Sequence, residues 1–276
     1  MRVYVMTDLE GVAGVLNFSD WCLPESRYYE LAKELLTREV NAAIEGFFAG
    51  GATRILVADG HGAGAISPVL LDSRVELMRG FGMGWPFLLD EGFDVVAWVG
   101  QHAKAGAGYA HLAHTQWFNW IDLSINGVSI GEFGQLAMCA SELGVRAIFL
   151  SGDQAACAEA QQLVPGIETV SVKRGTTPGA GPHAGDELDT VAYTARNTGA
   201  VHTHPETARA MIRAGAERAM RRAKQESFGL IPLTPPFERV AVFRNEAGQP
   251  PRVDRRQHPT SVIDVMNLPL AWRFVQ

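Results

Sequence analysis

Continuous apolar runs recur along the chain, with helical stretches between them. The first such stretch has leucines and alanines at i, i+3 and i+4, as one face of a buried helix requires. Apolar runs without alternation are typical of strands buried on both faces of a sheet. The predicted strands are Met1–Asp8, Arg54–Asp59, Asp94–Gly100, Arg146–Asp153, Ile167–Lys173 and Arg239–Arg244, and the predicted helices are Glu25–Ala49, Gly134–Leu143, Gln154–Leu163 and Pro205–Gln225.

Loop signals separate these elements. Gly50 and Gly51 end the first helix, and residues 175–185 are rich in Gly, Pro and Thr. The polar, proline-containing stretch Asn245–Pro259 is expected to be a surface loop. The pattern predicts an α/β fold with a mainly parallel sheet covered by helices and a smaller C-terminal subdomain. We expect an α/β metal-binding domain over residues 1–200, and a helical segment with a small subdomain over 201–276.

Ionisable residues stand where several predicted strands end. These are Asp8 and Glu10, then Asp59 and His61, His102, and Asp153. In open α/β sheets, ligands bind outside the carboxyl ends of the strands. The separate strand ends are therefore expected to face one crevice.

The first of these strand ends carries two acids, Asp8 and Glu10. In an extended segment residues i and i+2 point to the same side, so their repulsion calls for a positive partner. His61 and His102 each follow another strand. A lone loop histidine is usually a surface or capping residue, but two after parallel strands, with two acids after a third strand, favour zinc or a similar transition metal.

Glu132 is a further candidate ligand. Asn126 and Gly127 predict a hairpin turn, and Glu132 then begins a helix, where the dipole suits an anion. It could equally be an ordinary first-turn carboxylate. Three carboxylates and two histidines exceed what one catalytic zinc usually takes, and they fit two ions that share a bridging carboxylate.

Composition narrows the class of protein. The chain has 276 residues, 47% of them hydrophobic and 20% charged, as in an ordinary globular protein. A net charge of −6 without a basic stripe argues against a nucleic-acid partner. Three sparse cysteines, Cys22, Cys139 and Cys157, fit a reducing compartment. We see no signal peptide and no apolar run long enough to cross a membrane, so a cytoplasmic protein is expected.

Five motifs occur in order along the chain, "DLEGVAG", "ADGHG", "VGQHAKAG", "LAHT" and "INGVSIGEFG". Together they resemble the motifs of the D-aminopeptidases of the DppA type, a family of binuclear zinc peptidases. The resemblance runs from Met1 to about Lys173 and resumes around Pro205–Ala219. It implies two zinc ions per chain bound by Asp8, Glu10, His61, His102 and Glu132, with Asp8 as the bridge. It also implies His114 as the catalytic histidine.

The resemblance implies a zinc-dependent aminopeptidase that hydrolyses the N-terminal residue of short peptides, including peptides of D-amino acids, through a water activated by two metals. It also implies a homo-oligomer, a ring-shaped decamer in the family. His111 has no counterpart in the family motifs, so its replacement is expected to be nearly silent. Residues 176–200 look like an insertion. Trp117, Phe118 and Trp120 are expected in the core or an interface unless they line the pocket.

Two alternatives stay open on the sequence. "DLEG" resembles the opening motif of haloacid-dehalogenase-type phosphatases, and "SGDQAAC" resembles their acidic loop. In that interpretation Glu10 replaces the second Asp, Cys157 stands where a second loop acid should be, and the histidines have no role. Asp153 fits a strand-end or helix-capping residue better. The other alternative is a non-catalytic metal-binding scaffold of the same fold.

Overall fold

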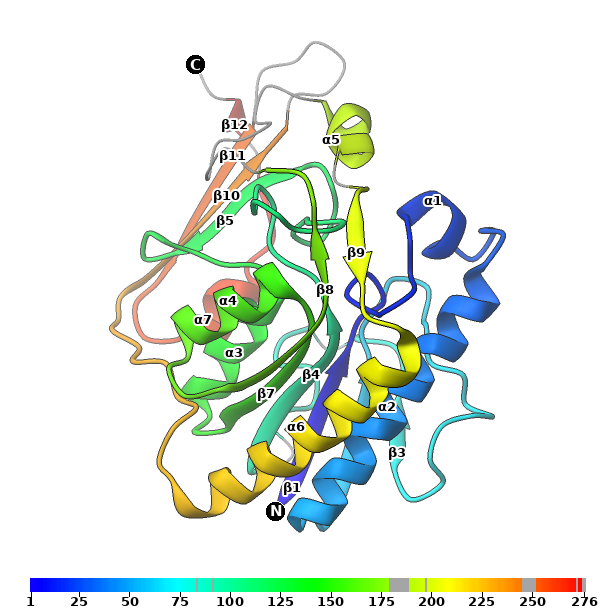
Figure 1. Cartoon of the computed structure of the whole chain (residues 1–276). Helices are drawn as coiled ribbons and strands as arrows, with labels where there is room; N and C mark the ends of the chain where they lie inside the picture. Colours follow the sequence, from blue (N-terminus) through cyan, green and yellow to red (C-terminus); the bar gives the residue numbers. More distant parts are fainter. Residues whose placement is uncertain are drawn as a thin grey trace.

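The computed structural model describes residues 1–82, 84–90, 92–178, 189–196, 198–244, 252–271 and 273–274. A large twisted sheet runs through the middle of the molecule, and a smaller sheet lies beside one end of it (Figure 1). In spatial order the large sheet contains β3 (Glu76–Met78), β2 (Arg54–Asp59), β1 (Arg2–Thr7), β4 (Val95–Gln101), β7 (Arg146–Asp153), β8 (Glu168–Gly175) and β9 (Ala200–His202).

All neighbouring strands of the large sheet are parallel except β8 and β9. Helices α2 (Tyr29–Gly50) and α6 (Pro205–Gln225) cover one face, and α3 (Glu132–Glu142) and α4 (Gln154–Leu163) cover the other. The side chains under α2 and α6 form a first hydrophobic core, and those under α3 and α4 form a second one. On β1, Val3 and Val5 belong to the first core and Tyr4 belongs to the second. Burial on both faces explains the continuous apolar runs, and the predicted α/β class is confirmed.

The smaller sheet is antiparallel. It contains β12 (Arg273–Phe274), β11 (Arg252–His258), β10 (Phe237–Phe243), β5 (Trp120–Ile125) and β6 (Val128–Ser129) in spatial order, with α7 (Val262–Asn267) packed against β10 and β11. β5 and β6 form the hairpin predicted from Asn126 and Gly127, both of which have positive φ.

The expected surface loop over Asn245–Pro259 is wrong for its second half, because Arg252–His258 forms β11; residues 245–251 lie outside the described part of the chain. The strand is rich in charge, which hides it from a hydrophobic pattern. Asp254 is fully buried and pairs with Arg239 of β10, with Arg239 Nη2 and Asp254 Oδ2 3.0 Å apart. A paired buried charge can occupy an inward-facing position that an apolar side chain would normally fill.

Residues 1–200 and residues 201–276, the two predicted parts of the chain, both contribute strands to each sheet. β10 pairs with β5 of the N-terminal part in the smaller sheet, and β9, which continues beyond residue 200, pairs with β8 in the large sheet. Helix α6 also packs against α2. The division into residues 1–200 and 201–276 stays a prediction. The short elements α1 (Phe18–Trp21), β3, α5 (Thr190–Arg196), β9, α7 and β12 were not predicted, because they span too few residues to show a period.

Predicted boundaries shift by a few residues. The first helix begins at Tyr29 instead of Glu25, and α3 begins at Glu132, the residue expected to open it. The Gly- and Pro-rich loop over 175–185 lies mostly outside the described residues. None of the helices in the described part of the chain is long and apolar enough to cross a membrane.

The contact between α2 and α6 depends on small residues. A Cβ atom on Gly46 of α2 would overlap the carbonyl oxygen of Arg213 and the side chain of Ala216 on α6. Gly50 approaches Met220 in the same way. The two helices can therefore pack closely over the first core only where α2 has no side chain.

We expect Gly46→Ala to lower the free energy of unfolding by about 1–3 kcal/mol, because overpacking outweighs the gain in helix propensity of about 1 kcal/mol. Urea denaturation would measure the change. Gly82→Ala is the control, since a Cβ there meets nothing within 4 Å. If Gly46→Ala and Gly82→Ala were equally stable, α2 and α6 would be able to move apart and accommodate the added methyl group without cost.

Candidate metal centre

The candidate residues lie where the order of strands in the large sheet reverses. From β1 the chain first builds outward through β2 and β3, and then returns to place β4 on the other side of β1. Ligands of open α/β sheets bind at such a switch point, outside the carboxyl ends of the strands. Asp8 and Glu10 follow β1, His61 follows β2, and His102 follows β4.

The turns after β1 and β4 touch through their backbones. The amide of Gly11 donates to the carbonyl of Gly100 at 2.8 Å, and the amide of Asp8 donates to the carbonyl of Val99 at 3.0 Å. A Cβ on Gly11 would overlap the carbonyl of Gln101, and Gly100 has a φ of 81°. Glycine is required at both positions, because only a backbone without side chains can come this close.

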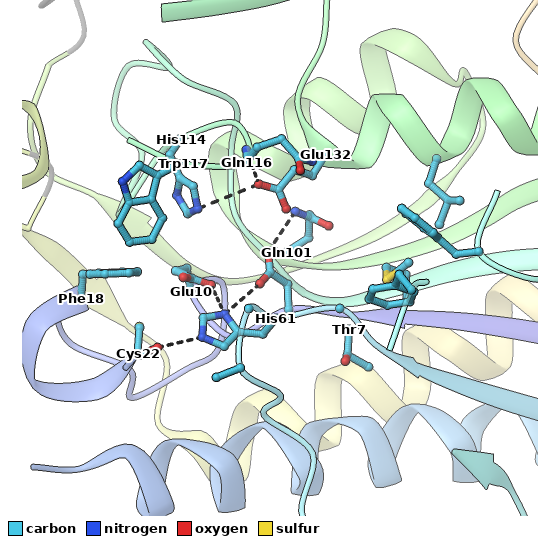
Figure 2. Close-up of a pocket in the computed structure, with 18 of the residues that line it drawn as sticks. Thr7, Glu10, Phe18, Cys22, His61, Gln101, His114, Gln116, Trp117 and Glu132 are labelled. Carbon is cyan, nitrogen blue, oxygen red and sulfur yellow. Dashed lines mark hydrogen bonds and ion pairs between the residues drawn. The ribbon is translucent and has the colours of Figure 1, made fainter. Parts of the chain in front are cut away.

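The crevice holds two groups of three potential metal ligands. One contains Asp8, Glu10 and His61, and the other contains His102, His114 and Glu132; within each group the ligand atoms lie within 4.8 Å of one another. All but Glu132 are buried. Figure 2 shows Glu10, His61, His114 and Glu132 around one cavity.

Asp8 lies between the two groups. Its Oδ1 is 3.5 Å from His61 Nδ1 and its Oδ2 is 3.0 Å from His102 Nε2. Glu10 Oε2 is 3.1 Å from the same His61 nitrogen, so both acids do project to one side of the strand end. Glu132 Oε1 is 3.5 Å from His102 Nε2. Each oxygen of Asp8 thus faces a different histidine.

Each of the three histidines binds a backbone carbonyl through its other ring nitrogen. His61 Nε2 lies 2.8 Å from the Cys22 oxygen, His102 Nδ1 2.9 Å from the Ala103 oxygen, and His114 Nδ1 2.7 Å from the Leu112 oxygen. A carbonyl only accepts, so these nitrogens carry the proton. In the neutral ring the remaining nitrogen then presents a lone pair to the carboxylates, as in ligating histidines oriented by a second hydrogen bond.

The arrangement calls for positive charge. Lone pairs and carboxylate oxygens converge at 3.0–3.5 Å, and His102 Nε2 is buried without a hydrogen-bond partner. Burial opposes charge on the rings, yet the carboxylates raise the pKa values of His61 and His102 well above the usual value. Buried imidazole and carboxylate donors are the ligands that zinc takes in proteins, so the residues fit this metal.

His114 is held between two rings. It stacks on His102 with centroids 3.9 Å apart and on Phe118 with centroids 4.4 Å apart. Its Nε2 is 3.9 Å from Glu132 Oε1. Burial, and then His102, lower the pKa of His114. The ring is therefore neutral near pH 7, with a fixed orientation and its Nε2 directed at the cluster.

A second layer of polar side chains, three of them buried and His202 half-buried, holds the loop after Glu10, and no sequence motif indicates it. The layer binds four consecutive residues of that loop. The contacts join Glu39 Oε1 to the Ala13 amide (3.0 Å), His202 Nδ1 to the Gly14 amide (3.1 Å), Lys173 Nζ to the Val15 carbonyl (3.3 Å) and His111 Nε2 to the Leu16 carbonyl (3.1 Å). The residues come from four distant segments, so no local motif reveals them.

His111 therefore has a structural position that the sequence did not suggest. It is fully buried, its amide donates to Asp153 Oδ2 at 3.0 Å, and its ring meets His202 edge to face. The expectation that its replacement would be nearly silent conflicts with these contacts. Gln101 was also missed: its amide nitrogen is 3.3 Å from Asp8 Oδ2. The position of Gln101 directly before His102 was the only indication in the sequence that it lies at the site.

Asp153 lies outside the cluster. It caps α4, accepting from the Ala155 amide at 2.7 Å, which is the capping role expected for it. Of the three aromatic residues after His114, Phe118 is buried and Trp120 packs on Phe243, as expected of core residues. Trp117 instead lines the cavity and is 45% exposed.

The titration of Glu39 gives a test of the second layer. Burial raises the pKa of Glu39 to about 7, although the Ala13 amide, Lys173 and Arg209 act in the opposite direction. Between about pH 4.5 and 7 the folded state holds a proton that the unfolded state has lost, so stability falls as pH rises. We expect Glu39→Gln to exceed the wild type by on the order of 2–3 kcal/mol at pH 8 and to match it near pH 4.

Urea denaturation across this pH range measures the difference. Glu34→Gln, on a solvent-accessible part of the same helix, is the control and should follow the wild type. A difference between Glu39→Gln and wild type that does not change with pH would show that Glu39 is ionised in the folded protein throughout.

Comparisons with known proteins identify the fold and the family of this chain. A family model described as D-aminopeptidase matches residues 1–188. A D-aminopeptidase of Bacillus subtilis (strain 168) is 29% identical over 179 residues, which are 63% of this chain and 64% of the relative, so the match spans less than two thirds of the relative's length. The solved structure of the Zn-dependent D-aminopeptidase DppA from Bacillus subtilis, described as a self-compartmentalizing protease, matches with a TM-score of 0.81 and 21% identity, covering 96% of this chain and 94% of that one. The structural match shows a common fold, and the family model, which covers more than half of the sequence, shows that this chain belongs to the D-aminopeptidase family.

Proposed function

We propose that this protein is a zinc-dependent aminopeptidase that removes the N-terminal residue of short peptides. The observation that carries the proposal is the pair of buried ligand groups joined by Asp8, whose two oxygens face His61 and His102. Two zinc ions per chain would be held by the carboxylates and histidines of these groups, with Asp8 as the bridge. The proposed ligands are Asp8, Glu10, His61, His102 and Glu132.

Bound zinc supplies two kinds of chemistry, since it polarises the scissile carbonyl and lowers the pKa of water. The chain's own contribution is orientation and proton transfer. The backbone carbonyls of Cys22 and Ala103 fix the ring planes of His61 and His102, so the ligands need no reorganisation.

His114 is the proposed acid and base. Its Nδ1 proton is fixed on the Leu112 carbonyl, so Nε2 can take a proton from the attacking water and return it to the leaving amine. The stacked rings of His102 and Phe118 prevent the imidazole from turning. Glu132, in addition to its ligand role, is anchored by the Gln116 amide, which donates to its Oε1 at 2.7 Å.

The site suits short substrates. The cavity has a volume of about 300 Å³, which is at the lower end for ligand pockets. The structural relative is described as self-compartmentalizing, and we propose that this chain also forms a homo-oligomer, a decamer by its family. Light scattering during size-exclusion chromatography would test this, and a monomer at all concentrations would contradict it.

Two alternatives make different predictions. A phosphatase of the haloacid-dehalogenase type would need Asp153 near the reacting atoms, whereas this residue caps α4 and binds the His111 amide. A non-catalytic scaffold would bind zinc and hydrolyse nothing. Amine release from L- and D-aminoacyl amides and dipeptides, with zinc measured on the same sample, separates the three.

We expect Asp8→Ala to lose both zinc ions together, because Asp8 faces both groups, whereas His61→Ala should lose mainly one. Atomic emission measurements on dialysed protein would give the zinc content. His258→Ala, in β11 and outside the cluster, is the control. Full zinc content in Asp8→Ala would refute its bridging role.

We expect His114→Ala to retain two zinc ions and most of its substrate affinity, while kcat falls by on the order of 10²–10⁴, as for a lost acid and base. Steady-state kinetics and zinc analysis of the same preparation would check this. Loss of one zinc would instead make His114 a ligand, together with His102 and Glu132. Unchanged turnover would leave it with a packing role only.

A further inference from the structure

Part of the cavity lining, here called the apolar end, consists of five apolar side chains that belong to or pack against the core on the α3 side of the large sheet. They come from β1, from the segment before β4 and from α3, and the sequence analysis gave them no role. None carries a charge, in contrast to the acids and histidines beside them. They are Met6, Phe81, Trp85, Phe87 and Leu136.

The aromatic members of this apolar end pack against one another. Ring centroids are 4.6 Å apart for Phe81 and Phe87, and 4.3 Å apart for Trp85 and Phe87. Each ring is only partly buried against the core on the α3 side of the sheet. The rings therefore present apolar surface to the cavity.

Backbone contacts fix this wall. Asn267, the last residue of α7, accepts from the Trp85 amide at 2.9 Å and donates to the Trp85 carbonyl at 2.9 Å. The Tyr4 hydroxyl donates to the Phe87 carbonyl at 2.8 Å. Two elements that are distant in sequence, α7 and β1, thus hold the wall in place before any ligand arrives, which reduces the entropy lost on binding.

Two aromatic residues, Phe18 and Trp117, line another part of the cavity. Phe18 and Trp117 meet there edge to face with centroids 5.3 Å apart, and Trp117 is 45% exposed (Figure 2). Phe18 belongs to the core on the other face of the large sheet, so the two ends flank the metal-binding groups from different sides. A peptide's N-terminal residue has no chain before it, so its side chain can lie against the partly buried rings of the apolar end while the rest of the peptide extends past the more exposed Trp117.

Building on the proposed aminopeptidase activity, we propose that the apolar end binds the side chain of the substrate's N-terminal residue, and that this residue is large and apolar. An aromatic or branched aliphatic side chain would remove the wall's apolar surface from water, and a methyl group would leave most of it wet. Pre-formed apolar pockets discriminate by about 10–200-fold for each methylene group.

The test compares phenylalanine, leucine and alanine amides, each as both enantiomers, with the zinc-loaded protein. For the preferred enantiomer, kcat/KM for the phenylalanine and leucine amides should exceed that for alanine amide by at least about tenfold. Trp85→Ala and Phe81→Ala should each lower the phenylalanine-to-alanine ratio by at least about fivefold. The control is Tyr109→Ala, an aromatic residue that is 60% exposed and outside the cavity, which should keep the ratio.

If no amine is released, calorimetric titration with the same amides still measures their binding, and the side-chain preference is decided from the affinities. Efficient hydrolysis of alanine amide without a preference for larger side chains would overturn the inference and leave the aminopeptidase intact. Absence of hydrolysis with two zinc ions bound, but tighter binding of phenylalanine amide, would overturn the aminopeptidase and keep the apolar site. If the preference for phenylalanine amide over alanine amide is unchanged in both Trp85→Ala and Phe81→Ala, a different surface of the protein binds the side chain.

Discussion

The close approach of the turns after β1 and β4 is the constraint on which the site depends. Gly11 and Gly100 let the two backbones touch, and this brings Asp8 within 3.0 Å of His102 although 93 residues separate them. A side chain at either glycine would force the turns apart. The switch in strand order creates the crevice, but the glycines decide how near its two walls come.

The cluster formed in this way is unfavourable by itself. Three carboxylates and three imidazole lone pairs share a largely buried space, where charge without compensation costs several kcal/mol. The structure holds these groups in position through contacts outside the cluster, namely the backbone carbonyls that bind the histidines and the polar layer under residues 13–16. Lys173 and Glu39 are themselves buried there, so part of the fold's stability maintains a binding site.

The smaller sheet also contributes to the site, although none of its strands supplies a proposed ligand. It positions α7, and Asn267 of α7 fixes the backbone of Trp85 in the cavity wall. The ion pair between Arg239 and Asp254 links β10 and β11 under the same helix, since Arg239 also donates to the Met266 carbonyl at 2.9 Å. The C-terminal residues thereby influence a cavity on the N-terminal part of the chain.

The sequence by itself determined the parallel sheet, its main helices and the positions of Asp8, Glu10, His61, His102 and Glu132 at element ends. Burial on both faces leaves continuous apolar runs, and strand ends are visible where these runs stop. It did not reveal β11, because its inward-facing position carries Asp254, whose charge is satisfied only by a distant partner. Nor did it reveal Lys173, His111 or Asn267 as supports, because each acts on a segment between 95 and 182 residues away. Contacts of that range leave no periodic trace in the chain, so only the tertiary structure decided them.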